Sequence, residues 1–312
     1  MGQICSLCGT DPYYVSIAMK QPHGAICGWM DTNLHQNELK EEHIQTWLHM
    51  VLSRHAWNHQ ILYNDEEPDN IPEHSFPKRK GHTKGMVLWN SRKIGWLVHS
   101  VPKYPEPLRL ETPFMIPNIS EAQLIYGQSF CYVEMNMVHY DKIISAIQNM
   151  ESSIYYTTLP SETFLKRTLK ENQVIEFELY PNVFHVSKSS VWEKELYQDY
   201  LAVRMNGPIL VQTWMKNGLP STAQVKNIKM MKLGEHEEYK TSQDHSKFAV
   251  SMNCRHPWLF IGDINRMDSQ FKRGGGGMLI EDKNLWKSVN RMIQNYTEDV
   301  ENPNRSPGTL CC

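Results

Sequence analysis

Two patterns of apolar residues alternate along this chain. One is a short apolar run, and the other has an apolar residue at every third or fourth position. Short apolar runs predict strands, and the second pattern predicts helices. The predicted strands span residues 13–19, 84–89, 96–101, 209–214, 245–252 and 258–264. The predicted helices span residues 39–54, 140–147, 161–172 and 285–296. Five prolines make residues 102–117 a predicted extended loop. This alternation is typical of an α/β protein.

Two of the predicted strand pairs carry the same short motif near their start. His82 and Lys84 lie at the start of the pair at 84–101, and His245 and Lys247 lie at the start of the pair at 245–264. Residues i and i+2 of a strand point to one face, so each motif presents an imidazole beside an ammonium group. Beyond this two-strand context, no internal repeat is visible in the sequence.

Two such motifs that face each other would form a compact cationic site suited to a phosphodiester. The lysines would hold the non-bridging oxygens, one histidine would attack phosphorus, and the other would protonate the leaving oxygen. A single His-x-Lys arises easily by chance in a chain with 14 His and 32 Lys plus Arg. The motif alone therefore does not indicate a function, and the residues that flank it are needed as evidence.

Charge and composition bound the partners of the protein. The chain has 312 residues, a hydrophobic fraction of 40% and a formal net charge of −2 with neutral histidines. Protonation of all 14 His would bring the formal charge to +12, so acid conditions favour binding of a polyanion. The sequence has no run of 18 or more apolar residues, so no membrane span is predicted. The seven Cys do not form a zinc set, and no metal site is predicted.

The residues around both motifs resemble the deoxyribonuclease II family, which is related to the phospholipase D fold. The matching segments are 13–22, 61–65, 81–85, 96–102, 126–128, 244–247, 262–266 and 273–276, whereas residues 151–240 match loosely. The resemblance implies a two-lobed, phospholipase D-like α/β fold with mixed sheets flanked by helices. It also implies an N-terminal lobe at 1–150, a C-terminal lobe at 151–312, and an active site at the seam between them.

The resemblance further implies that His82 and His245 are the nucleophile and the acid, with Lys84 and Lys247 binding the phosphate. His82 is the favoured nucleophile, because relatives in the wider fold use the N-terminal histidine. A phosphohistidine and a 3′-phosphate product follow, without cofactor or metal. One histidine must be protonated and the other neutral, which predicts a bell-shaped pH profile on the acid side. The predicted supporting residues are His99, Ser100, Gln128, Asp263 and Asn265.

Other residues have both a functional and a structural interpretation. Arg273, Gly274 and Gly275 form either a phosphate-binding loop or a flexible surface loop. His185 lies in a segment that resembles the family, and we expect it to be structural. The resemblance implies a disulfide between Cys131 and either Cys5 or Cys8. The candidate glycosylation sites are Asn118, Asn295 and Asn304.

The resemblance implies a lysosomal or secreted protein, although residues 1–30 show no signal peptide. The alternative is a cytosolic protein lipidated at Met1–Ser6 and at Cys311 and Cys312. The expected function is that of a metal-independent acid endodeoxyribonuclease acting on double-stranded DNA, with homodimer formation left open. Two alternatives remain: an inactive secreted paralogue that binds nucleic acid or a host protein, and a phosphodiesterase acting on lipid or RNA.

Overall fold

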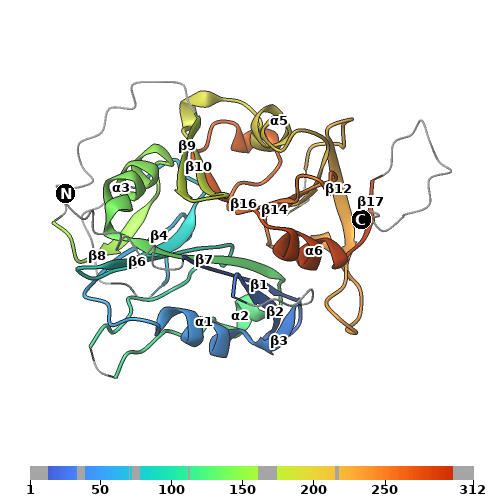
Figure 1. Ribbon diagram of the computed structural model, residues 1–312. Helices are drawn as coiled ribbons and strands as arrows, with labels where there is room; N and C mark the ends of the chain where they lie inside the picture. The colour runs from blue at the N-terminus through green and yellow to red at the C-terminus, as the bar shows by residue number, and fades with distance from the viewer. Residues whose placement is uncertain are drawn as a thin grey trace, which may run out of the picture.

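The computed structural model describes residues 13–33, 39–69, 71, 78–111, 113–160, 174–214 and 218–297. Two large sheets form most of this part of the chain (Figure 1). The first sheet has the order β3 (Lys40–His43), β2 (Ile26–Asp31), β1 (Tyr14–Lys20), β7 (Gln128–Asn136), β6 (Lys93–His99), β5 (Lys84–Trp89), β4 (His59–Asn64) and β8 (Ile154–Thr157).

The second sheet takes its strands from the other half of the chain. Its order is β13 (Tyr239–Lys240), β12 (Val225–Met231), β11 (Ile209–Gln212), β14 (Phe248–Ser251), β15 (Trp258–Gly262), β16 (Gly275–Glu281), β10 (Val183–Lys188) and β9 (Val174–Tyr180), and β17 (Ile293–Tyr296) pairs with β12. All strand pairs of the first sheet are antiparallel, whereas β11 and β12 run parallel. The prediction of mixed sheets is therefore right for the second sheet and wrong for the first.

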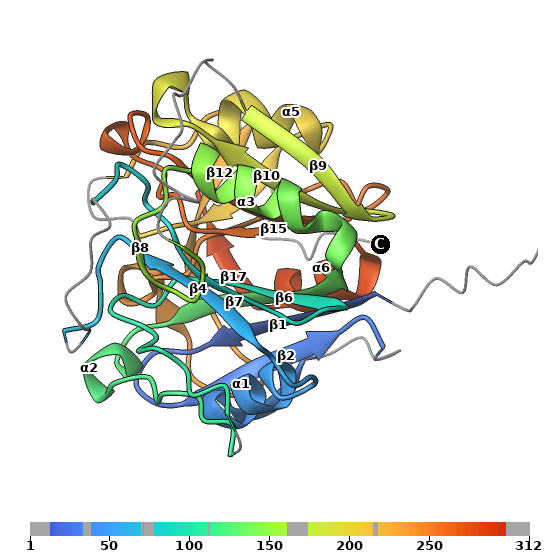
Figure 2. The ribbon, with the colours of Figure 1, turned by 90° about the vertical axis from the view of Figure 1, so that its left-hand side faces the viewer.

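Helices cover the outer faces of the sheets and fill the space between them. The helices are α1 (Ile44–Leu52), α2 (Glu121–Leu124), α3 (Tyr140–Asn149), α5 (Ala202–Arg204) and α6 (Lys283–Arg291), with a π-helical turn η3 (Tyr197–Leu201) before α5. Figures 1 and 2 show α3 and α6 between the two sheets, α1 outside the first sheet and α5 outside the second. The central hydrophobic core joins residues of both sheets with the buried faces of α3 and α6.

Two predicted helices are shorter in the structure than the sequence pattern suggests. Residues 40–43 pair with β2, so α1 begins at Ile44, where the His43 side chain accepts a hydrogen bond from the Gln45 amide. At the other end of the chain, α6 ends at Arg291, and residues 293–296 form β17 instead of a further helical turn. In both places strand pairing overrides the local helical pattern. The predicted helix at 161–172 lies outside the described residues.

The two sheets contain the same five-stranded unit, which is a larger repeat than the two-strand context seen in the sequence. In space the unit runs β1-β7-β6-β5-β4 in one sheet and β10-β16-β15-β14-β11 in the other. The chain visits the strands of both units in the same order, and all neighbours within each unit are antiparallel. The register makes Lys84 equivalent to Lys247 and Gly127 equivalent to Gly274.

Two equivalent lysines, one in each five-stranded unit, form hydrogen bonds to nearby loops. Lys20 pairs with Gln128 at the end of β1, and Lys188 pairs with Gly275 at the end of β10. Both side chains are buried, and each ammonium group donates to three backbone carbonyls, those of Gln21, Gly24 and Leu124 for Lys20 and those of Gln270, Phe271 and Arg273 for Lys188. Because Leu124 and Arg273 closely precede Gly127 and Gly274, these bonds fix both glycines in place.

His185 lies in the core between the sheets, in agreement with its expected structural role. Its ring stacks on Trp96 at 4.2 Å, and neither ring nitrogen has a hydrogen-bond partner. Burial lowers the pKa of His185 to about 3. The folded protein therefore binds fewer protons than the unfolded chain below about pH 6.5, and stability falls as the pH falls.

The substitution His185→Phe is expected to reduce this dependence on pH. Between pH 7.5 and pH 5 the free energy of unfolding should fall by about 2 kcal/mol less in the variant than in the unmodified protein. Urea denaturation at both pH values measures the difference. Phe177→Leu is the matched control, because it changes the same ring cluster without removing a titrating group. An unchanged pH dependence in His185→Phe would contradict the prediction.

Candidate active site

The first motif leads into β5 at the seam between the sheets. The amide of His82 donates to the carbonyl of Gly274 at 2.8 Å, and Nδ1 of His82 lies 2.5 Å from the carbonyl oxygen of Asp263. A carbonyl can only accept, so Nδ1 carries a proton and the neutral ring keeps its lone pair on Nε2. His82 is largely buried, at 8% exposure. Its ring is thus fixed in one tautomer by residues of the second half of the chain.

A buried carboxylate neutralises the cations around His82. The Asp65 side chain lies 2.5 Å from Nζ of Lys84, 3.0 Å from Nη2 of Arg273 and 3.9 Å from Nε2 of His82. Burial alone would raise the pKa of Asp65, but His82, Lys84 and Arg273 hold it well below its usual range. Asp65 is therefore ionised throughout the ordinary pH range.

The second motif precedes β14 and has a different environment. The amide of His245 donates to the carbonyl of Gly127 at 2.8 Å, and Nζ of Lys247 donates to the carbonyl of His245 at 2.6 Å. The His245 ring stacks on Tyr126 with 4.2 Å between the ring centroids and an interplanar angle of 11°. The Trp214 ring is nearly perpendicular to the His245 ring, with 4.3 Å between the centroids. Aromatic contacts therefore hold this imidazole, whereas hydrogen bonds to the carbonyls of Gly274 and Asp263 hold His82.

The backbone bonds of the two histidines are reciprocal. His82 binds Gly274 of the second half, and His245 binds the equivalent Gly127 of the first half. Gly127 also forms a parallel bridge with Asp244. These contacts bring both His-x-Lys motifs to one seam, where the charge of Lys84 acts on the pKa of His245 and of Lys247.

The clustered cations and their burial shift the protonation of the site. Burial and then the charge of Lys84 lower the pKa of Lys247 to about 7. Burial, followed by the charges of Lys247 and Lys84, lowers the pKa of His245 to about 3, and burial and Lys84 hold the pKa of His82 well below its usual range. Both histidines are thus neutral in the free protein near pH 5, while Lys247 carries charge.

The predicted supporting residues have mixed positions. His99 is buried beside the cations, where burial and then Lys84 and Lys247 lower its pKa to about 3, and its Nδ1 accepts from the Val101 amide. Ser100 donates to Oε1 of Gln128 at 2.6 Å, and the buried Nε2 of Gln128 has no hydrogen-bond partner. The side chain of Asn265 is buried and its Oδ1 has no hydrogen-bond partner.

Asp263, a predicted supporting residue, orients His82 through its backbone carbonyl. The carboxyl group of Asp263 instead accepts from the Gly276 amide at 2.8 Å, and burial raises the pKa of this group to about 8. The carboxyl is therefore protonated at neutral and acid pH. At neutral and acid pH, the Asp263 side chain therefore places no negative charge next to the two lysines.

The glycine-rich segment is not an exposed loop. Gly275 is the first residue of β16 and is buried, and a side chain on Gly274 would lie 2.1 Å from the carbonyl oxygen of Met150. The glycines are required by the close approach of the protein's own backbone. The prediction of a flexible surface loop is therefore wrong for Gly274 and Gly275. The role of Arg273, Gly274 and Gly275 in phosphate binding stays a prediction.

The predicted disulfide is absent at its described end. Cys131 is a free, fully buried thiol in β7, where it packs in the core between the sheets. Cys254 is disulfide-bonded, which the sequence does not predict. Cys5, Cys8, Asn304 and both proposed lipidation sites lie outside the described residues. Asn118 and Asn295 are exposed.

Three residues at the site were not predicted as functional. Asp65 ends a family-like segment, and Tyr126 begins another, but neither residue type indicated an ion pair or a ring stack with a histidine. Trp214 lies in the loosely matching region and gave no signal. These residues stand out once the two five-stranded units are compared. Asp65 and Trp214 occupy equivalent positions in the two units, as do Arg273 and Tyr126.

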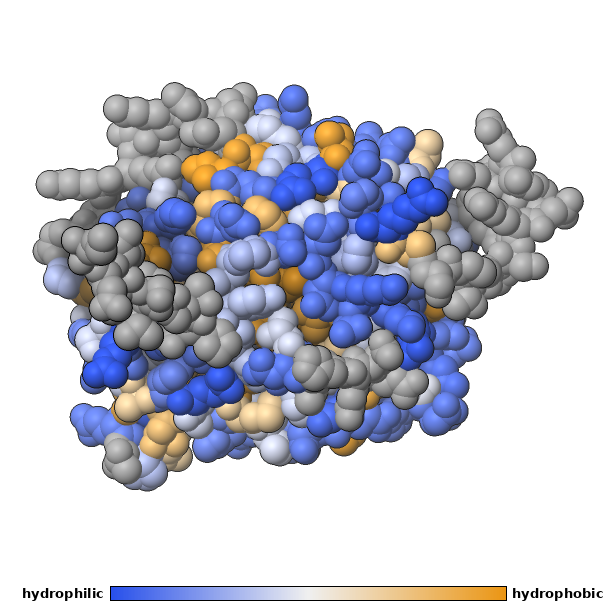
Figure 3. All heavy atoms as spheres, viewed as in Figure 1, coloured by the Kyte–Doolittle hydropathy of each residue, from blue (hydrophilic) through white to orange (hydrophobic). Residues whose placement is uncertain are grey.

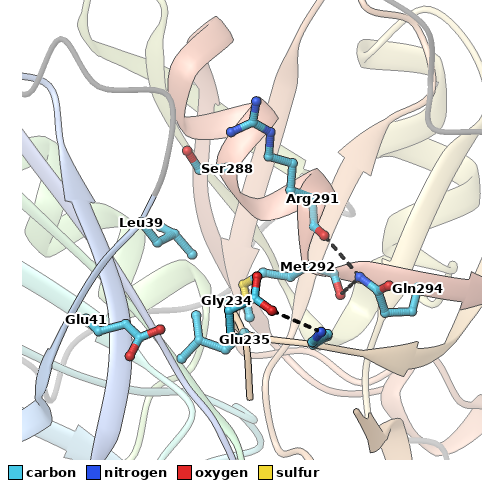
Figure 4. A pocket seen from close by; sticks show the side chains of 10 residues that line it. Leu39, Glu41, Gly234, Glu235, Ser288, Arg291, Met292 and Gln294 are labelled. Carbon is cyan, nitrogen blue, oxygen red and sulfur yellow. Dashed lines mark hydrogen bonds and ion pairs between the residues drawn. The ribbon is translucent and has the colours of Figure 1, made fainter. Parts of the chain in front are cut away.

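A separate pocket of about 360 Å³ lies between the two halves of the chain (Figure 4). Its lining comes from Leu39 and Glu41 next to and within β3, from residues 232–235 after β12, and from Ser288 to Gln294. It contains no residue of either motif, so we do not assign the reaction to it. The face seen in Figure 3 is mainly polar with small separate apolar areas. No helix in the described residues is long and apolar enough to cross a membrane.

Comparison with known proteins shows the family of this chain. The deoxyribonuclease II family model matches residues 25–299, and the chain belongs to this family. Deoxyribonuclease-2-beta of Mus musculus is 26% identical over 76% of this chain and 70% of its own length. Plancitoxin-1 of Acanthaster planci is 28% identical over the same shares, and cell-death-related nuclease 7 of Caenorhabditis elegans is 26% identical over 76% of this chain and 68% of its own.

Proposed function

We propose that this protein is a metal-independent acid endodeoxyribonuclease that cleaves DNA to 3′-phosphate products. Family membership and the names of the relatives support a deoxyribonuclease-type hydrolase. The reciprocal bonds of His82 to Gly274 and of His245 to Gly127 carry the proposal, because they bring both His-x-Lys motifs to one seam. Related proposals are a phospholipase D-like two-lobed architecture divided near residue 150, a lysosomal or secreted location, and a homodimer.

In the proposed reaction, Lys84 and Lys247 bind the non-bridging oxygens of the scissile phosphate. The Nε2 lone pair of His82 forms a bond to phosphorus as the P–O5′ bond breaks, and His245 gives its proton to O5′. Neutral His245 then takes a proton from water, which attacks phosphorus and breaks the P–N bond. The histidines return to their starting states, and the upstream strand keeps a 3′-phosphate.

The electrostatics of the site support activity at acid pH. His245 must be protonated in the complex, yet nearby lysines lower its pKa to about 3 in the free protein. A bound phosphodiester brings a negative charge that offsets Lys84 and Lys247, so the pKa of His245 rises and a proton is taken up with the substrate. Above about pH 7 Lys247 begins to lose its charge, which weakens phosphate binding.

Plasmid cleavage from pH 4 to pH 8 in excess chelator tests the proposal. The unmodified protein should nick the plasmid best on the acid side and leave 3′-phosphate ends, identified by their sensitivity to a 3′-phosphatase. His82→Ala and His245→Ala should each lower the rate of cleavage by a factor on the order of 10³ or more. His256→Ala, at a half-exposed histidine in the second half of the chain, is the matched control and should cleave normally. Cleavage at the unmodified rate in both active-site variants would rule out the proposed pair, and inactivity of the unmodified protein would favour a binding paralogue.

A further inference from the structure

The two histidines lie in chemically different surroundings, although the strands that carry them are equivalent. Asp65 lies next to His82 and Lys84. Arg273 pairs with Asp65 and donates to the carbonyl of Gly81, directly before His82. The equivalent positions next to His245 hold Trp214 and Tyr126. One side of the phosphate site is therefore ionic and the other aromatic.

The aromatic side of the phosphate site is only partly buried. Tyr126 and Trp214 are both partly exposed, and their ring centroids are 5.8 Å apart in an edge-on arrangement. Ile125, next to Tyr126, is 47% exposed. Partly exposed aromatic rings beside a cationic phosphate site are the features that bind unpaired nucleobases, because every base presents a π-face for stacking.

The ionic side suits the phosphate backbone instead. The Arg273 guanidinium donates to the carbonyls of Lys80 and Gly81, which brings the exposed Lys80 and Lys272 to the same rim. Exposed cations at such a rim bind neighbouring phosphates without selecting a base. The two sides therefore differ in what they can recognise.

We infer that Tyr126 and Trp214 form a subsite for the nucleobase of the downstream nucleotide, the one whose 5′ oxygen leaves. This inference rests on the proposed function. The attacking and leaving atoms lie in line on opposite sides of phosphorus. With His82 as the attacking group, O5′ points toward His245, and its sugar and base enter the space next to Tyr126 and Trp214. A base in a duplex must leave its stack to bind there, which favours single-stranded or frayed DNA.

Single-stranded oligonucleotides with one cleavable phosphodiester test the inference, with phosphorothioates at all other linkages. Three versions are compared on the unmodified protein: both bases present, the downstream base removed, and the upstream base removed. Loss of the downstream base should raise KM on the order of 10- to 100-fold, the effect expected for one aromatic stacking contact. Loss of the upstream base should change KM less than about threefold.

Tyr126→Leu and Trp214→Leu extend the test. Each should raise KM for the complete substrate and then show little further loss when the downstream base is removed, since the contact is already gone. Tyr126 also packs on His245, so kcat can fall as well, but a purely positioning role would not remove the sensitivity to the base. Tyr13→Leu is the control, because Tyr13 stacks on Tyr180 at the far end of β1 and should leave all three KM values unchanged.

The outcomes separate this inference from the proposed function. Equal KM for all three oligonucleotides, with cleavage still dependent on His82 and His245, overturns the subsite and leaves the proposed reaction standing. Greater sensitivity to the upstream base also overturns it, because the aromatic side would then bind the other nucleotide. Cleavage at the unmodified rate in His82→Ala removes the premise itself. If a leucine variant does not fold, the substrate comparison on the unmodified protein still decides.

Discussion

The double substitution His82→Ala/His245→Ala is expected to lower kcat by about the same factor as either single substitution, on the order of 10³- to 10⁵-fold. The proposed reaction needs both rings in the same step, because P–N bond formation and proton transfer to O5′ occur together. Once one ring is gone, the other has no step left to assist, and groups that act as a unit show strongly non-additive losses. Lys84 and Lys247 remain in the variants and account for residual activity.

Single-turnover cleavage of a plasmid at pH 5 with protein in excess measures these factors. His256→Ala should stay within about twofold of the unmodified protein, since His256 pairs with Glu281 at the surface. A double variant whose loss equals the product of the two single losses would show that the histidines act in independent steps. The cooperative mechanism would then be wrong, even if both residues were needed.

The sequence predicted the strands that carry the motifs more accurately than the elements around them. Residues 84–89 form β5 as predicted, because an unbroken apolar run is buried on both faces of the strand. Residues 40–43 and 293–296 instead form strands where helices were predicted. Their side-chain patterns are compatible with a helix, and only the available edges of β2 and β12 make pairing the better state. Such a choice depends on contacts far away in the sequence.

The residues of the repeated His-x-Lys motif were predicted from the sequence. The site residues at which the two five-stranded units differ were not. His82, Lys84, His245 and Lys247 share a spacing that a sequence displays directly. Trp214 occupies the position equivalent to Asp65, yet the two residues share no chemistry, so no sequence comparison between the halves would pair them. The orientation of His82 by a backbone carbonyl is equally invisible, because any residue type at position 263 carries that oxygen.

Asp65→Asn is expected to lower the free energy of unfolding at pH 7 by about 3–5 kcal/mol. The substitution keeps the shape of the side chain but removes the nearer counter-ion of the Lys84 ammonium, which is 2% exposed. The more exposed carboxylate of Glu66 remains at 3.8 Å. Removal of one partner of a buried pair costs more than the pair contributes, because the remaining charge stays desolvated. The double variant Asp65→Asn/Lys84→Met should therefore recover part of the loss, although it will not cleave DNA.

Urea denaturation provides the measurement, and Asp69→Asn provides the matched control. Asp69 pairs with Lys103 at 2.7 Å, but both side chains are largely exposed, so its loss should cost less than about 1 kcal/mol. The low pKa of Asp65 adds a second expectation. A carboxylate with a depressed pKa stabilises the fold above its ordinary pKa near 4 and loses that effect as the pH falls, so the difference between the unmodified protein and Asp65→Asn should shrink below about pH 4. Equal losses in Asp65→Asn and Asp69→Asn would mean that solvent, rather than Asp65, neutralises the Lys84 charge.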